Sequence, residues 1–520
     1  MILENGVIRT LDPSLPVARA LAIAGDRVAG GVGTHETALA SPETVDLGGR
    51  CVLPGFTDSH VHFVAWAMAE REVRFEGTCS LEEAVERVRD AVPSVPPGGW
   101  LRGRGWRNGD WSPPVEPTRQ VLDAVTGDVP TALTARDGHS MWLNSAALAH
   151  ADRDLRVDGG VVEVDEAGEP TGILREESAW IFRERFVEAA YSEADCMDAI
   201  RAGLKLAATR GVTAIHAAVT NEDRWLGGLP FFERLDADDA LTLRVWQWIP
   251  HQYVADVATV GMRSRFGSDR LKLGALKAFM DGTLGSQTAL LLDGSGVRIT
   301  SQEELEELIR HGARAGFPVA VHAIGDLANR DALDAFEATR DLWQPLGLRP
   351  RIEHAQCLAP EDVPRFAELG VAASVQFVHA TSDRELTERI WADRADRAYL
   401  FRSLWDSGAV VANGSDAPVE ELDPLMGLRA GVLRTTDDRD PWRPEESLTL
   451  EQALHATCVA PAWLTHEERS RGKLLPGFLA DLVVLSSDPF DDLEGCEVVA
   501  TMVGGRWVYN PPPWDEVSIL

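Results

Sequence analysis

The stretch Leu53–His62, LPGFTDSHVH, decides how the rest of the chain is interpreted. Its apolar start predicts a β-strand, and this strand ends in His60-Val61-His62. Residues i and i+2 of an extended segment point to the same side, so the two imidazoles can face one metal ion. An isolated His-x-His is at least as often two ordinary surface or core histidines. The metal-site interpretation therefore depends on which residues the fold places beside this pair.

The sequence around this stretch alternates apolar, β-rich runs with helical segments, a pattern that favours a parallel α/β architecture. One helix is indicated by Ser301, a helix-capping residue, with Glu304 three positions later. Eight strands are the number that closes a (β/α)8 TIM barrel. The candidate strands are Val52–Asp58, Val212–Ala217, Thr242–Trp248, Leu273–Phe279, Pro318–Ala323, Pro350–His354, Val371–Gln376 and Ala409–Gly414.

Further residues of metal-binding type stand at the ends of later candidate strands. His322 and His354 each close an apolar run, and Asp416 follows the last run. Barrel strands surround a common axis, so side chains at their carboxyl ends can converge with His60 and His62 on one site. Taken singly, each histidine could be a hydrogen-bonded core residue, and Asp416 a helix cap. Taken jointly, they predict a divalent-metal site at the C-terminal mouth of the barrel.

A lysine, Lys277, lies in the segment Leu276–Ser286, within the apolar candidate strand Leu273–Phe279. A lysine in such a strand must extend to solvent, pair with an anion or be chemically altered. Carbamylation by CO2 would invert its charge and provide two oxygens that can bridge two cations. The sequence also allows the alternative that Lys277 forms an ion pair with Asp281.

Short, turn-punctuated runs at both ends of the chain predict a small β domain. The expected division is a terminal domain of residues 1–54 and 468–520, and a barrel of residues 55–467. An insertion of about residues 70–200 follows the first barrel strand, and we expect it to lie over the barrel mouth, where loops of such enzymes select the substrate.

Composition narrows the class of protein. A net charge of −32 over 520 residues argues against nucleic acid as a partner, because phosphates repel an acidic surface. No apolar run approaches the ~20 residues that cross a bilayer. The first residues lack the pattern of a secretory signal, so we expect a cytoplasmic protein without a membrane partner.

Several motifs, distributed over nearly the whole chain, carry a resemblance to a known family. They are Pro54–His62, Asp137–His139, Gly172–Arg175, Lys277–Ser286, His322–Asp326, Glu353-His354, His379–Asp383, Ser415–Val419 and Gly477–Leu485. Together they resemble the amidohydrolase superfamily, and more closely amidohydrolase family 3, which includes the YtcJ-like proteins and the N-substituted formamide deformylases.

The resemblance implies a barrel flanked by a β-sandwich built from both termini, and a homodimer. It also implies a set of metal ligands. His60 and His62 would bind the more buried metal, and Lys277 would bridge if it is carbamylated. The second metal would be bound by His322 and His354, while Asp416 would touch both metal and water.

Two further histidines, His139 and His379, match family positions near the substrate pocket. There they could polarise a carbonyl group or merely order loops. Some positions depart from the pattern of many relatives: the chain has His216-Ala217-Ala218, Gln376-Phe377-Val378-His379 and Gly285-Ser286-Gln287. These changes leave all the candidate metal ligands in place. Because they lie near the pocket, the substrate of a relative does not identify the substrate of this chain.

The expected reaction is hydrolysis of a non-peptide, amide-type C–N bond in a small molecule by metal-activated water. Asp416 would take the proton of the water and pass it to the leaving nitrogen. We expect about one to two divalent ions per chain, with Zn²⁺ first among them. Alternatives are a lactonase, esterase or deaminase on the same site and, from another class, a non-catalytic scaffold.

Overall fold

The computed structural model describes residues 1–29, 41, 43–136, 139–151, 154–220 and 226–514. The chain forms two compact units, each described here by itself. The first consists of Met1–Trp66 with Arg201–Leu520, and the second of Ala67–Ile200. The unit boundaries fall within the helices α1 (Phe63–Ala69) and α6 (Glu193–Thr209).

The first unit contains the predicted (β/α)8 barrel. Its eight parallel strands lie in chain order, each paired with the next. After the last strand, the backbone N–H of Asp416 donates to the carbonyl oxygen of His60 in the first strand at 2.7 Å. The strands are β6 (Phe56–Val61), β13 (Val212–Ala217), β14 (Arg244–Pro250), β15 (Leu271–Phe279), β16 (Val319–Ala323), β17 (Arg351–His354), β18 (Ala372–Val375) and β19 (Val411–Asn413).

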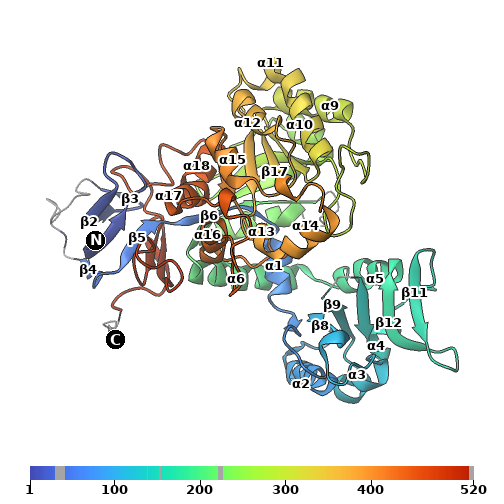
Figure 1. Ribbon diagram of the computed structural model, residues 1–520. Coiled ribbons are helices and arrows are strands. Elements are labelled where there is room, and N and C mark those ends of the chain that lie inside the picture. Colours follow the sequence, from blue (N-terminus) through green and yellow to red (C-terminus); the bar gives the residue numbers. More distant parts are fainter. Residues whose placement is uncertain (30–40, 42, 137–138, 152–153, 221–225, 515–520) are drawn as a thin grey trace. The chain divides into compact units, whose positions relative to one another are not determined.

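Helices cover the outside of the barrel, which explains why its strands are apolar on both faces (Figure 1). The predicted capping box at Ser301 and Glu304 is confirmed at the start of α9. Among the described residues, no helix is both long and apolar enough to cross a membrane. Besides α1 and α6, the helices of this unit are α7 (Leu229–Ala237), α8 (Val254–Thr259), α9 (Gln302–Ala315), α10 (Asp326–Ala338), α11 (Arg340–Trp343), α12 (Val363–Leu369), α13 (His379–Ser382), α14 (Arg384–Ile390), α15 (Phe401–Asp406), α16 (Pro424–Leu433), α17 (Leu450–Leu454) and α18 (Ala460–Leu464).

A second sheet of the first unit combines strands from both ends of the chain, in the order β22-β21-β20-β5-β1-β2-β3, with β4 paired to β1. Alternate side chains of these strands, Leu3, Leu21, Leu482 and Val484 among them, form a core of their own. The exact domain boundaries remain a prediction. The strands are β1 (Ile2–Arg9), β2 (Val17–Ala24), β3 (Arg27–Val28), β4 (Thr44–Asp46), β5 (Cys51–Pro54), β20 (Leu482–Leu485), β21 (Val498–Val503) and β22 (Arg506–Tyr509).

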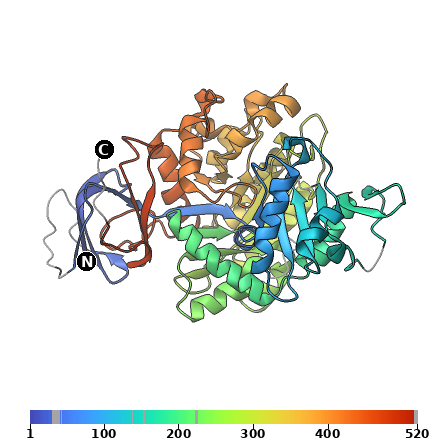
Figure 2. The same ribbon diagram turned by 90° about the horizontal axis from the view of Figure 1, so that it is seen from below.

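The expected single strand Val52–Asp58 is wrong, because the chain changes sheets inside it. β5 pairs with β1 and β20 of the terminal sheet, whereas β6 opens the barrel. Figure 2 shows this blue segment running from one sheet into the other. The change occurs at Gly55, where a Cβ atom would lie 2.2 Å from Cγ2 of Thr213. Both halves are buried and apolar, so their hydrophobic pattern does not reveal the break.

The second unit is a six-stranded sheet of order β11-β12-β10-β9-β8-β7 with helices on both faces. β11 and β12 form an antiparallel hairpin. Trp106, Trp111 and Trp142 pack against one another in its core. The elements are β7 (Val73–Arg74), α2 (Leu81–Ala91), β8 (Leu101–Trp106), α3 (Arg119–Thr126), β9 (Thr131–Ala135), β10 (Ser140–Leu143), α4 (Ser145–Leu148), β11 (Gly160–Val164), β12 (Pro170–Glu176) and α5 (Glu177–Phe182).

A buried ion pair joins the barrel to the terminal sheet. Arg244 of β14 donates through Nε and Nη2 to the two carboxylate oxygens of Asp481, at 2.7 and 3.0 Å. Burial alone would raise the pKa of Asp481, but Arg244 outweighs burial and lowers it. Asp481 also accepts from the backbone N–H of Gly504. The pair therefore holds strands of both sheets in one arrangement.

We predict that Asp481→Asn lowers the free energy of unfolding by about 3–5 kcal/mol, because it leaves the guanidinium of Arg244 buried without its anion. Chemical denaturation followed by circular dichroism measures this. The matched control is Asp239→Asn, which breaks the exposed pair between Asp239 and Arg506 and should cause no measurable change. Equal stability of the two variants would contradict the prediction.

Candidate metal centre

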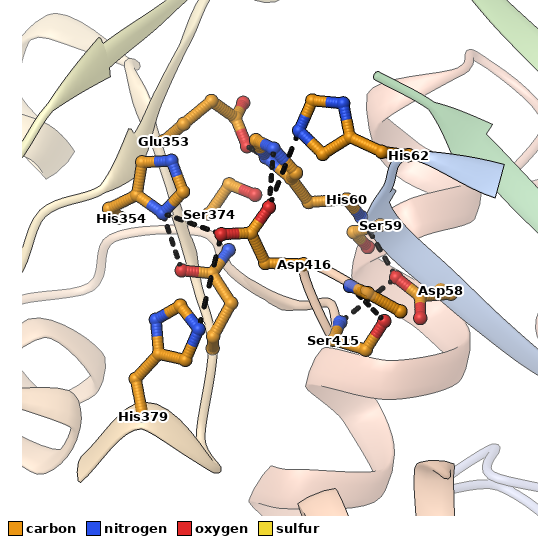
Figure 3. A network of polar contacts seen from close by, with 12 residues as sticks. Asp58, Ser59, His60, His62, Glu353, His354, Ser374, His379, Ser415 and Asp416 are labelled. Carbon is orange, nitrogen blue, oxygen red and sulfur yellow. Dashed lines mark hydrogen bonds and ion pairs between the residues drawn. The ribbon is translucent and has the colours of Figure 1, made fainter. Parts of the chain in front are cut away.

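The carboxylate of Asp416 lies at the centre of a cluster of histidines at the carboxyl ends of the barrel strands (Figure 3). Its Oδ1 is 3.4 Å from Nε2 of His60 and 3.5 Å from Nε2 of His62. Its Oδ2 is 4.0 Å from Nδ1 of His354 and 4.0 Å from Nε2 of His379. Ligand atoms at about 2.0–2.2 Å from a tetrahedral cation lie roughly 3.3–3.6 Å apart. The spacing around Oδ1 therefore matches that of ligands sharing one cation.

Backbone hydrogen bonds fix the two segments that carry these groups. Asp58 Oδ1 accepts from the backbone N–H of both His60 and Ser415, each at 3.0 Å. Asp416 and His354 have positive φ angles of 60° and 74°. Such a conformation costs about 1–3 kcal/mol in a residue other than glycine and persists only where the surroundings enforce it. Both residues are thus held in strained conformations that turn them toward the cluster.

Burial favours the neutral form of three imidazoles in this region, those of His60, His322 and His354. It lowers the pKa of His60 to about 4 and that of His322 to about 3, and the charge of Lys277 adds to the effect. Burial, together with His322, also holds the pKa of His354 well below its ordinary value. A neutral imidazole retains a lone pair, which is the form that binds a metal.

Asp416, by contrast, is an anion. Burial alone would raise its pKa, but the electrostatic interaction with the His60 side chain and a hydrogen bond with His62 outweigh burial and hold it well below the ordinary value. Nε2 of His60 and Nε2 of His379 are buried and have no hydrogen-bond partner among the described residues. Buried polar atoms without partners destabilise a protein unless a ligand satisfies them. A divalent cation beside Asp416 fits this donor set.

His322 and Lys277 also lie in the cluster region. The ring of His322 is 4.5 Å from that of His354, and its Nε2 donates to the carbonyl oxygen of Gly282 at 3.0 Å. Lys277 is buried, its Nζ lies 5.4 Å from the ring centre of Trp248, and Nζ has no hydrogen-bond partner among the described residues. Burial lowers its pKa to about 8.

Asp281, the alternative partner that the sequence allowed for Lys277, binds backbone groups instead. Its carboxylate accepts from the backbone N–H groups of Leu290, Ile324 and Gly325. Asp281 therefore orders the loops behind His322, and among the described residues it makes no hydrogen bond with the lysine amine. The amine of Lys277 stays without an anionic hydrogen-bond partner.

The two histidines expected near the substrate pocket lie in different units. His379, at the start of α13, belongs to the cluster, and its Nδ1 accepts from the side-chain amide of Gln356 at 3.2 Å. His139 lies in the second unit, where its Nδ1 is 2.8 Å from Oε2 of Glu176 and its ring meets the edge of Trp180. Asp137 and Gly138 lie outside the described residues. A role of His139 at the metal centre stays a prediction.

Sequence reasoning missed the contribution of Glu353. Its Oε2 is 2.6 Å from Nδ1 of His60, and Arg351 contacts both of its carboxylate oxygens. Burial alone would raise the pKa of Glu353, but Arg351 and His60 outweigh it and hold it well below the ordinary value. The alternation Arg351-Ile352-Glu353 is the sequence pattern that could have revealed this pair, because it places the two charges on one side of a strand.

Known proteins are similar in sequence to this chain over most of its length. The family model described as "Amidohydrolase family" matches residues 43–509. The chain is 32% identical to Protein LONG AFTER FAR-RED 3 of Arabidopsis thaliana, with 98% of this chain and 91% of that protein aligned. It is 30% identical to the putative amidohydrolase YtcJ of Bacillus subtilis (strain 168), over 93% and 95% of the two chains. The N-substituted formamide deformylase of Arthrobacter pascens is 28% identical over 98% of each.

A solved structure has the same fold. The crystal structure of an uncharacterized metal-dependent hydrolase from Pyrococcus furiosus superposes with a TM-score of 0.78 at 29% sequence identity. The match covers 94% of this chain and 99% of that one. The similarity therefore includes both the barrel and the parts of the chain outside it.

We predict that Gly414→Ala disturbs the cluster, because a Cβ atom there would lie 2.4 Å from the backbone nitrogen of His60. Such overpacking costs about 1–3 kcal/mol of stability, and the displaced His60 should weaken metal binding. Thermal unfolding and a zinc titration measure the two effects. Gly109→Ala, where a Cβ atom would meet nothing within 4 Å, is the control. Indistinguishable variants would contradict the close packing described.

Proposed function

This chain belongs to the amidohydrolase family and is a metal-dependent hydrolase, and we propose that it cleaves a non-peptide, amide-type C–N bond in a small molecule. The observation that carries the proposal is the convergence of four imidazoles on the two carboxylate oxygens of one buried aspartate, Asp416. The C–N bond is supported by similarity to a relative named for removing the formyl group of N-substituted formamides.

We propose that His60, His62 and Asp416 hold one divalent cation, and that His322 and His354 bind a second, with Lys277 as a bridge if it is carbamylated. The proposal is supported by proximity: the ligand atoms of His60, His62 and Asp416 lie within 4.8 Å of one another, and so do those of His354, His379 and Asp416. Zn²⁺ is the expected ion, because imidazole and carboxylate are its common ligands. Bound there, the cation polarises a carbonyl oxygen and makes a water molecule more acidic.

Asp416 suits the proton transfer that amide hydrolysis requires. As a buried carboxylate it can accept the proton of the attacking water and deliver it to the leaving nitrogen. An amine is a poor leaving group unless it is protonated, so a proton carrier beside the reacting atoms matters more for an amide than for an ester. The two oxygens of Asp416 face different histidines, which allows one to stay engaged while the other carries the proton.

We propose that His379 polarises a substrate carbonyl. Gln356 donates to its Nδ1, so the proton of the neutral ring lies on Nε2, the atom that faces Asp416. That N–H can donate to a developing oxyanion. We propose a corresponding pocket role for His139 from the sequence motif alone. A cytoplasmic location and a homodimer likewise stay predictions.

The purified protein should hold about one to two divalent ions per chain, because each proposed ligand group binds one ion. Elemental analysis measures the content. A chelator should remove the metal together with activity, and Zn²⁺ or Mn²⁺ should restore both. A fully active protein that lacks metal would exclude the proposed chemistry.

Turnover measured on a panel of substrates should identify the bond that the protein cleaves. The panel contains N-substituted formamides and other amides, lactones and esters, and amines. We expect turnover of amides to exceed that of the other classes, because Asp416 supplies the proton that the leaving nitrogen needs. Preferential hydrolysis of lactones, or release of ammonia from amines, would replace the proposed reaction with the corresponding alternative. No turnover of any class by the metal-loaded protein would favour a non-catalytic scaffold.

Asp416→Asn should reduce kcat on the best substrate of that panel by about 100- to 10,000-fold, the usual contribution of a general acid–base. Circular dichroism should show an intact fold. Asp331→Asn, which alters a buried aspartate of α10 that pairs with Arg298, is the control and should retain normal kcat. Near-normal turnover of Asp416→Asn would remove the proton-transfer role.

A further inference from the structure

A buried ion pair lies directly behind His60, on the side of the ring opposite its contact with Asp416. Glu353, which is fully buried in β17, places Oε2 2.6 Å from Nδ1 of His60. The other ring nitrogen, Nε2, is 3.4 Å from Asp416 Oδ1. Figure 3 shows Glu353 and Asp416 on either side of this imidazole. His60 is thus held between two carboxylates that contact different nitrogens.

The proton of His60 can be located from its partners. Arg351 donates through Nε to Oε1 of Glu353 and through Nη2 to Oε2, the latter at 3.1 Å. Arginine remains charged and has only donors, so Glu353 beside it is a carboxylate that only accepts. The Nδ1 of His60 must therefore carry the proton and donate it to Glu353. The lone pair is then on Nε2, facing the cluster.

Arg351 is itself immobilised by groups from several barrel strands. Its Nη2 also donates to the carbonyl oxygen of Ser59 at 2.8 Å and to Oγ of Ser374. Its Nη1 donates to Nδ1 of His216 at 2.8 Å, and the guanidinium lies 4.9 Å from the ring centre of Trp248. These contacts come from β6, β18, β13 and β14. The pair therefore cannot shift unless the interior of the barrel shifts.

We propose that Glu353, held by Arg351, is a positioning residue that fixes both the tautomer and the orientation of His60, so that Nε2 is the atom that binds the cation. This inference rests on the proposed metal site. Glu353 is not available as a ligand, because Arg351 and His60 occupy both of its oxygens. Removing a carboxylate that orients a ligating histidine typically weakens metal affinity or activity about 10- to 100-fold.

The test is Glu353→Gln in the full-length chain, which preserves size but removes the charge and puts an amide N–H₂ where only acceptors fit. Zinc affinity is measured by competition with a chromophoric chelator, alongside the melting temperature. We expect zinc to bind about 10- to 100-fold more weakly. The matched control is Glu446→Gln, another buried carboxylate, which accepts from the N–H and hydroxyl of Ser403. Its zinc affinity should equal that of the wild type.

The outcomes separate the two claims. Wild-type protein that binds no zinc overturns the proposed function and this inference together. If the wild type binds zinc and a folded Glu353→Gln variant binds it with equal affinity, only the positioning role is overturned. Loss of a purely stabilising ion pair would lower the melting temperature without changing the zinc affinity.

A measurement on the wild type keeps the test decisive if Glu353→Gln does not fold. In a crystal structure of the zinc-loaded wild type, His60 should bind zinc through Nε2 while Nδ1 stays within hydrogen-bond distance of Glu353. Ligation through Nδ1, or by Glu353 itself, overturns the inference.

Discussion

The hydrogen bond from the backbone N–H of Asp416 to the carbonyl oxygen of His60 is the contact on which the site depends. It joins the end of the last barrel strand to the first, and Asp58 strengthens the junction by accepting from Ser415. Without this closure, residues more than 350 positions apart would have no reason to meet. The junction places a carboxylate over two imidazoles and leaves the backbone of Asp416 in a strained conformation that only the closed barrel can impose.

Charge balance inside the barrel follows from that geometry. Arg351 and Glu353 compensate each other beneath His60. On the other side of His60, Asp416 is a buried carboxylate surrounded by histidines, and among the described residues it forms no ion pair with an arginine. Buried charges are retained when they are paired or when they coordinate a metal. The Arg351–Glu353 pair therefore orients His60, while the buried carboxylate of Asp416 favours the binding of a cation.

The sequence predicted the barrel, because parallel strands appear as apolar runs, and it predicted that polar residues at the ends of these strands converge, because the barrel topology brings them together. It could not show the change of sheet at Gly55, since both flanking strands are equally apolar. It did not reveal the role of Glu353, because this carboxylate is next to His354 in the chain but contacts His60 on another strand. It grouped His354 with His322, whereas the described geometry also brings His379 to Asp416.

X-ray absorption at the zinc edge of the zinc-loaded wild-type protein tests the central claim most directly. The account predicts nitrogen and oxygen neighbours at about 2.0–2.2 Å, outer-shell scattering from at least two imidazoles, and no sulfur neighbour at about 2.3 Å. A spectrum dominated by sulfur, or one without imidazole scattering, would show that zinc binds elsewhere and that the histidines around Asp416 do not form the metal centre.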